Sequence, residues 1–133
     1  MSTYPQYTIV SGPIIIEDGK ILLVREDKHT GITPWMLPGG AYDPNDDSLE
    51  STCKRECKEE TGLDIEIIKP LRTLILPRTD TPDEKIVLVH WLARRLNEPS
   101  LQAEDVVFDI GWHDIHDLPK NTAPNVVEIV KDL

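Results

Sequence analysis

The sequence predicts an α/β fold in which a mixed β-sheet lies between helices. β-branched and apolar segments occur both before and after one central amphipathic helix, and a second segment with helical spacing follows them. The alternation is too irregular for a doubly wound parallel sheet. The 133 residues, of which 39% are hydrophobic and 29% charged, suffice for one core. We therefore expect a single domain over residues 1–133.

The first part of the chain is predicted to form a β-hairpin. Residues 7–16 are β-branched and apolar, the pair Asp18-Gly19 is typical of a tight turn, and residues 21–24 are apolar again. After a polar loop, residues 35–37 form a short apolar strand. The acidic loop over residues 42–47 then leads to the central helix.

The central helix is predicted over residues 48–61 by signals at both of its ends. Asp47, followed three positions later by Glu50, has the form of a capping box. Gly62 provides the left-handed residue that commonly ends a helix. We therefore interpret Asp47 as the N-cap of this helix.

The second half of the chain is predicted to return to strands. Residues 65–76 and 86–93 are β-branched and apolar, and a loop over residues 77–83 separates them. Another short strand is expected around Trp112. Apolar residues at helical spacing predict a final helix over residues 125–133.

The composition excludes several classes of partner. The net charge of −10 repels a polyanion, so a nucleic acid polymer is not an expected partner. No apolar run approaches the roughly 20 residues that a membrane-spanning helix needs. The N-terminus lacks a secretory pattern, and Cys53 and Cys57 are expected to be buried and reduced, so we expect a cytoplasmic location.

Three glutamates in the second half of the central helix indicate the chemistry. Glu56, Glu59 and Glu60 fall within a sector of about 100° on the helical wheel. A solvated acidic face is the ordinary alternative, and it would lie opposite the apolar stripe. Leu49 and Cys53 instead project within about 60° of Glu56, so the carboxylates are predicted to face the protein body. Clustered hard oxygen ligands of this kind suit Mg²⁺ or Mn²⁺.

These residues form part of a longer motif. Gly39-Gly40 and, after a loop, Arg55-Glu56-Cys57-Lys58-Glu59-Glu60-Thr61-Gly62-Leu63 resemble the Nudix box, G-x5-E-x7-R-E-U-x-E-E-x-G-U. Residues 19–24, 35–40 and 112–119 are also similar to the family. The resemblance implies a Nudix-type α/β/α sandwich. It also implies metal-dependent hydrolysis of a pyrophosphate bond in a nucleoside diphosphate-linked small molecule, by attack of water on phosphorus.

The resemblance also implies roles for individual residues. Arg55 would orient a carboxylate, and Glu56 or a distant acidic residue would accept the proton. The distant residue is expected to be Glu104, with Asp105 and Glu84 as alternatives. The implied ligands of Mg²⁺ or Mn²⁺ are Glu56, Glu59, Glu60 and the Gly40 carbonyl.

The box departs from the family pattern in its first half. Counting back from Arg55, the position of the first Glu is Asp47, and the gap from Gly40 to Asp47 is one residue too long. Asp47 either belongs to the metal network or caps the helix, and capping is the simpler role. This departure motivates an alternative function, a non-catalytic module that senses a nucleotide or binds a partner.

The substrate is expected to be small, phosphorylated and nucleotide-like. Arg25, Arg72 and Arg78 are candidates for phosphate contacts, with ordinary surface charge as the alternative, and Tyr42 is a candidate for stacking on a base. Pro77 lies near the position where the ADP-ribose-cleaving branch of the family tends to have a proline, which favours ADP-ribose or an NDP-sugar. The expectation also allows a homodimer.

Overall fold

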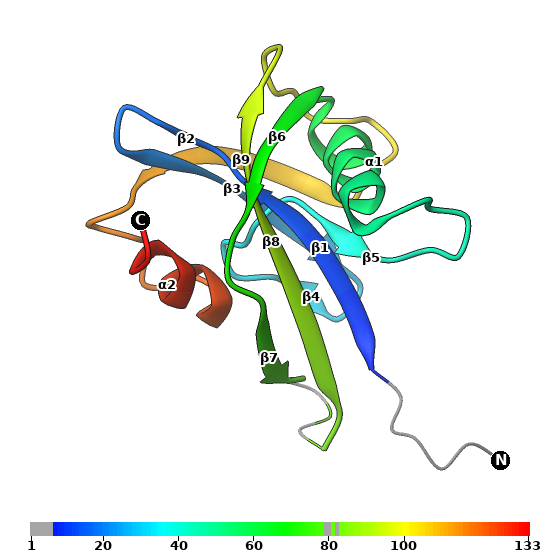
Figure 1. The fold of residues 1–133 in the computed structure, drawn as a ribbon. Coiled ribbons are helices and arrows are strands. Elements are labelled where there is room, and N and C mark those ends of the chain that lie inside the picture. The colour runs from blue at the N-terminus through cyan, green and yellow to red at the C-terminus, as the bar shows by residue number, and fades with distance from the viewer. Residues whose placement is uncertain (1–6, 79–80, 82) are drawn as a thin grey trace, which may run out of the picture.

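The strands of the protein form two β-sheets that lie between two helices. The computed structural model describes residues 7–78, 81 and 83–133. Helices α1 and α2 lie on opposite sides of the strands (Figure 1). The first sheet contains one parallel pair, β1 with β8, and is otherwise antiparallel, so it is mixed as predicted. Its strands are ordered β5 (Gly40–Ala41), β1 (Thr8–Ile14), β8 (Lys85–Arg95) and β6 (Ile65–Pro70), with β7 (Leu74–Pro77) also paired to β8.

The second sheet is antiparallel and is built on β3 (Lys20–Lys28), which pairs with β2 (Ile16–Glu17), β4 (Gly31–Ile32) and β9 (Val107–Asp114). The predicted hairpin is confirmed only for β2 and β3, where Asp18 and Gly19 both have positive φ. The prediction that the whole segment 7–16 pairs with β3 is wrong. Strand β1 runs in the first sheet, and the chain crosses between the sheets at Ile14 and Ile15.

Several predicted strand boundaries also change. The predicted strand over residues 65–76 is interrupted between β6 and β7, and residues 35–37 form only isolated bridges at Trp35 and Met36. The strand expected around Trp112 is confirmed as part of β9. The predicted loop over residues 77–83 lies partly outside the described residues.

Helix α1 (Leu49–Thr61) is confirmed, but its N-cap is Ser48 and the assignment of Asp47 is wrong. Ser48 has extended backbone angles, and its Oγ accepts the backbone N–H of Ser51 at 3.1 Å. The helix therefore begins one residue later than an Asp47 cap would allow. Gly62, with φ of 72°, ends the helix as predicted. Helix α2 (Pro124–Val130) begins at a proline and is shorter than predicted.

Each helix covers its own core. Cys53 and Cys57 of α1 are buried and free, and they pack in one core with residues that include Leu22 and Ile15. Val126 and Ile129 of α2 pack in the other core, with residues that include Ile14 and Leu23. The strands therefore lie between helices, which confirms the predicted sandwich. Within the described residues, neither helix has the length and apolar character needed to cross a membrane.

Candidate active site

Helix α1 presents its three glutamates at different depths. The Glu60 residue is 5% exposed, the Glu56 side chain is 19% exposed, and the Glu59 side chain is 53% exposed. Glu56 and Glu60 therefore face the protein body, whereas Glu59 lies at the edge of the site. The acidic face is not a uniformly solvated one, because its most C-terminal member is almost fully buried.

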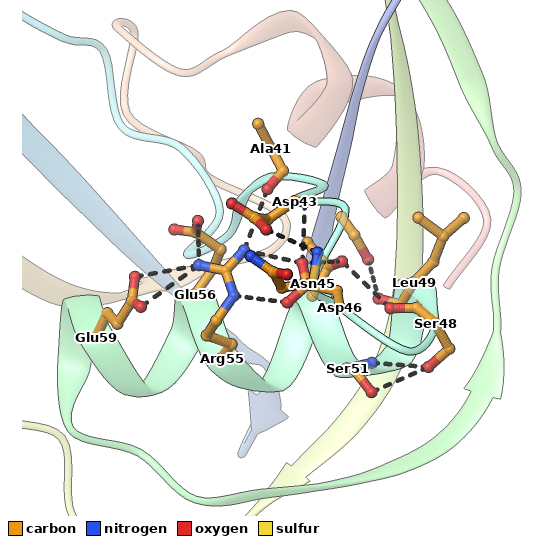
Figure 2. Close-up of polar contacts among 12 residues, drawn as sticks. Ala41, Asp43, Asn45, Asp46, Ser48, Leu49, Ser51, Arg55, Glu56 and Glu59 are labelled. Atoms are coloured by element: carbon orange, nitrogen blue, oxygen red, sulfur yellow. Dashed lines mark hydrogen bonds and ion pairs between the residues drawn. The ribbon is translucent and has the colours of Figure 1, made fainter.

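Arg55 connects the loop before α1 with these carboxylates. Its Nε and Nη2 donate to the Asp46 carboxylate at 2.8 and 2.9 Å. Its Nη1 donates to Glu56 Oε1 at 2.9 Å and lies 3.4 Å from both carboxylate oxygens of Glu59. Figure 2 shows the guanidinium between Asp46 on one side and Glu56 and Glu59 on the other. Hydrogen bonds from Arg55 hold the pKa of Asp46 well below its usual range.

Glu60 is a buried acid surrounded by other acids. Burial raises the pKa of Glu60 to about 9, although the backbone N–H of Gly39, which donates to Glu60 Oε2 at 2.9 Å, acts in the opposite direction. The negative charges of Glu26, Glu56 and Asp105 raise this pKa further. Burial also raises the pKa of Glu56, against the opposing effect of Arg55.

Gly40 lies directly against Glu56. A Cβ atom at position 40 would lie 2.4 Å from Cδ of Glu56 and 2.5 Å from its Oε2. A side chain at this position would therefore displace the Glu56 carboxylate. This close approach explains why the position suits glycine, and it brings the backbone of β5 beside the acidic cluster.

The residues present fit a hard divalent cation. In the part of the chain that the structure describes, no three His, Cys, Asp or Glu side chains already converge as ligands of one ion. The charges of Glu26, Glu56 and Asp105 nevertheless all act on the buried Glu60 carboxyl. Carboxylate oxygens are the ligands that Mg²⁺ and Mn²⁺ prefer, and such an ion would offset the repulsion among these groups.

The predicted distant acid, Glu104, and its neighbour Asp105 differ in exposure. Glu104 is exposed, whereas the charge of its neighbour Asp105 raises the pKa of both Glu56 and Glu60. The electrostatic effect on Glu56 and Glu60 therefore comes from Asp105, and the role of Glu104 stays a prediction. Glu84, the other alternative, lies 3.8 Å from Arg78 in an ion pair at the connection between β7 and β8.

The structure does not bring the three candidate arginines together. Arg25 pairs with Asp109 at 2.6 Å and lies over the rings of Trp35 and Phe108. Arg72 pairs with Asp132, which follows α2. Arg78, which follows β7, pairs with Glu84, which precedes β8.

Tyr42, the predicted stacking residue, lies close to the contacts of Arg55. It is exposed directly after β5, and its backbone N–H donates to Ile9 O at 2.8 Å. The carbonyl of its neighbour Ala41 accepts from Arg55 at 3.3 Å. Tyr42 therefore lies beside the loop that holds Arg55.

Sequence reasoning missed two residues, Asp46 and Glu26. Asp46 is six positions after Gly40, which is the spacing that the box has between its glycine and first Glu. Counting from Gly40 would have found it, because the extra residue lies between Asp46 and Arg55. Glu26 is buried at the end of β3, where strand alternation places it on the same face as Leu22 and Val24.

Comparisons with known proteins agree with this fold. The NUDIX domain model matches residues 7–133. An ADP-ribose pyrophosphatase from Methanocaldococcus jannaschii is 32% identical over 119 residues, which cover 90% of this chain and 68% of that protein. The crystal structure of MutT NUDIX hydrolase from Burkholderia pseudomallei superposes with a TM-score of 0.83 at 26% identity, covering 96% of this chain and 98% of that one.

A further relative is a longer protein and is similar to this chain over a shorter stretch. The Nucleoside diphosphate-linked moiety X motif 6 protein of Xenopus laevis is 37% identical over 54 residues, 41% of this chain but only 24% of that protein. The family model and the archaeal relative both span nearly the whole chain. With the Arg55-centred carboxylates on α1, they show that the chain belongs to the Nudix hydrolase family.

Proposed function

We propose that this protein hydrolyses a pyrophosphate bond in a nucleoside diphosphate-linked small molecule, with ADP-ribose or an NDP-sugar as the substrate class. The observation that carries the proposal is the pair of inward-facing carboxylates, Glu56 and Glu60, next to the Arg55 guanidinium. The archaeal relative that is named an ADP-ribose pyrophosphatase supports the choice of substrate class. A cytoplasmic location and a single domain over residues 1–133 remain part of the proposal.

Glu56, Glu59 and Glu60 would hold Mg²⁺ or Mn²⁺, with the Gly40 carbonyl as a further ligand. When bound, the cation lowers the pKa of water and offsets the charge of the diphosphate. Water attacks one phosphorus, a new P–O bond forms while the bridging P–O bond breaks, and two phosphomonoesters result. No covalent intermediate with the protein is needed.

The residues of the chain would supply the base and its orientation. Glu56 accepts a proton from the attacking water, and burial favours this because it raises the pKa of Glu56 and so makes its carboxylate a stronger base. Arg55 orients Glu56 through the 2.9 Å contact of its Nη1. Asp105 is the second candidate for the base, since its charge acts on both Glu56 and Glu60.

The experiment is a hydrolysis assay on ADP-ribose, a UDP-sugar and a nucleoside triphosphate, each with Mg²⁺ and with Mn²⁺. Glu56→Gln should reduce turnover by about 100-fold or more, the range expected for loss of a general base. Glu50→Gln is the matched control, because Glu50 is an exposed glutamate in the first turn of the same helix. Reaction in ¹⁸O-labelled water should place the label on one product phosphate.

Equal turnover in the wild type and Glu56→Gln would overturn the proposal. Tight binding of an intact nucleotide without product, under either cation, would favour the alternative of a nucleotide-sensing module. The altered loop that motivated that alternative still supplies a carboxylate, Asp46, to Arg55.

A further inference from the structure

Ser11 is a fully buried polar residue whose side chain joins strand β1 to helix α1. It lies in β1 and is 0% exposed. Its Oγ donates to the backbone carbonyl of Leu49, the first residue of α1, at 2.7 Å. The indole Nε1 of Trp91, in β8, donates to the same Oγ at 2.9 Å. The two hydrogen bonds of this hydroxyl therefore connect three separate elements of the fold.

The direction of these hydrogen bonds follows from the chemistry of the three groups. The indole N–H of Trp91 can only donate, and the carbonyl of Leu49 can only accept. The Ser11 hydroxyl therefore accepts from Trp91 and gives its own proton to Leu49. Because both positions around the buried oxygen are used in this way, the hydroxyl has one orientation, and it ties the start of α1 to one point on β1.

The backbone of Ser11 supports the other side of the site. Ser11 pairs with Gly40 of β5 in an antiparallel register. The two strands lie close together at this point, since a Cβ atom at position 39 would lie 2.6 Å from the Ser11 carbonyl oxygen. Gly39 donates its N–H to Glu60, and Gly40 lies against Glu56. One residue of β1 therefore contacts both β5 and the helix that carries the glutamates.

The distance between β5 and α1 has little tolerance at the glutamates. A Cβ atom at position 40 would lie 2.4 Å from Cδ of Glu56, and the hydrogen bond from Gly39 to Glu60 is 2.9 Å long. Figure 2 shows Leu49 at one end of α1 and Glu59 toward the other. Because hydrogen bonds join each turn of a helix to the next, a shift of the first turn is passed along α1 to these carboxylates.

We infer that Ser11, oriented by Trp91, is a positioning residue of the active site. Its hydroxyl sets the distance between α1 and β5, and with it the distance of Glu56 and Glu60 from the backbone of β5. Ser11 does not touch the substrate or the reacting atoms. The inference rests on the proposed function for its kinetic and metal-binding tests, whereas a third test, amide hydrogen exchange, needs neither turnover nor metal.

The experiment compares the wild type with Ser11→Ala, which removes the hydrogen bond to α1. Ser11→Ala should weaken the affinity for Mn²⁺ alone, measured by calorimetry, by about tenfold. It should lower kcat by about tenfold with a smaller change in KM, because the glutamates are displaced relative to β5. In the metal-free protein it should speed the hydrogen exchange of the Gly39 amide by about tenfold, since the bond from Gly39 to Glu60 opens more often.

The matched control for a loss of stability alone is Ile129→Val. It removes one methylene from a fully buried side chain in the core under α2, which costs about as much stability as one lost hydrogen bond. Ile129→Val should match the wild type in Mn²⁺ affinity and kcat, and it should change the exchange of the Gly39 amide less than Ser11→Ala does.

A second variant, Trp91→Phe, separates positioning from packing. It leaves the hydrogen bond from Ser11 to Leu49 in place but removes the donor that orients the hydroxyl. Its Mn²⁺ affinity and kcat should therefore lie between those of the wild type and those of Ser11→Ala. Trp91→Phe removes a larger volume than Ser11→Ala, so residues that only fill space would give the opposite order.

The inference is overturned if Ser11→Ala keeps the wild-type Mn²⁺ affinity or the wild-type exchange at Gly39, or if Ile129→Val loses as much. A greater loss in Trp91→Phe than in Ser11→Ala would also overturn it, as would a lower melting temperature of Ser11→Ala with unchanged kcat. Should Ser11→Ala not fold, the same measurements are made on Trp91→Phe, where wild-type values overturn the inference. If the wild type neither binds Mn²⁺ nor hydrolyses a substrate, the proposed function fails, and the exchange at Gly39 alone decides the role of Ser11.

Discussion

The buried carboxyl of Glu60 makes the stability of the metal-free protein depend on pH in a specific direction. Its pKa is raised from 4.5 to about 9, chiefly by burial. Between these two values the folded state holds a proton that the unfolded state has released. The stabilising contribution is therefore fully present below about pH 4.5 and is lost as the pH rises toward about 9.

The size of this effect follows from the same values. Between the two pKa values, each pH unit changes the free energy of unfolding by about 1.4 kcal/mol. The free energy of unfolding should therefore fall by up to about 3 kcal/mol between about pH 5 and about pH 7. Glu60→Gln is neutral throughout and should lack this fall. Urea unfolding at a series of pH values, with divalent ions chelated, measures the difference.

The control for this prediction is Glu59→Gln, which removes the same charge from a side chain that is 53% exposed. Glu59→Gln should follow the wild-type dependence on pH. If the wild type and Glu60→Gln lose stability in parallel as the pH rises, Glu60 does not ionise from a buried position, and the electrostatic reasoning about the site is refuted.

Three further predictions concern Gly40 and the two ends of α1. Gly40→Ala places a Cβ 2.4 Å from Cδ of Glu56 and should lower kcat by about tenfold or more without unfolding the protein. Steady-state kinetics and a melting curve test this prediction, and an unchanged kcat would contradict it. Ser48→Ala should lower the free energy of unfolding, measured in urea, by about 1 kcal/mol, whereas Asp47→Ala should leave it almost unchanged. The reverse order would show that Asp47 is the cap. Gly62→Ala should cost about 1–2 kcal/mol by the same measurement, because residue 62 has φ of 72°; a neutral substitution would mean that the helix end rearranges.

The central helix was predictable because its determining signals are local. Gly62 and the apolar spacing of Cys53 and Cys57 act within one or two turns, so the sequence indicates both the end of α1 and its buried face. The N-cap residue of α1 could not be predicted from local signals in the same way. Asp47 and Ser48 are adjacent residues of types that both cap helices, and the backbone conformation of Ser48 and its hydrogen bond from Ser51 distinguish them.

The sheet arrangement could be predicted only in part, because strand partners are chosen over long distances in the chain. Strand β1 pairs with β8, whose residues follow about 80 positions later, and no local pattern specifies that partner. The same limit applies to the site. The glutamates of α1 share one helix and could be predicted together. Glu26 is buried on β3, far from α1 in the chain, and no local pattern links it to the site.

The crossing between the two sheets has a consequence for how the protein unfolds. Ile14 packs in the core under α2, and the next residue, Ile15, packs in the core under α1. One peptide bond therefore joins the two hydrophobic cores, and neither can loosen without pulling a fully buried isoleucine of the other out of place. This linkage should couple both halves of the protein into one cooperative melting transition, in which probes placed in either core report the same midpoint.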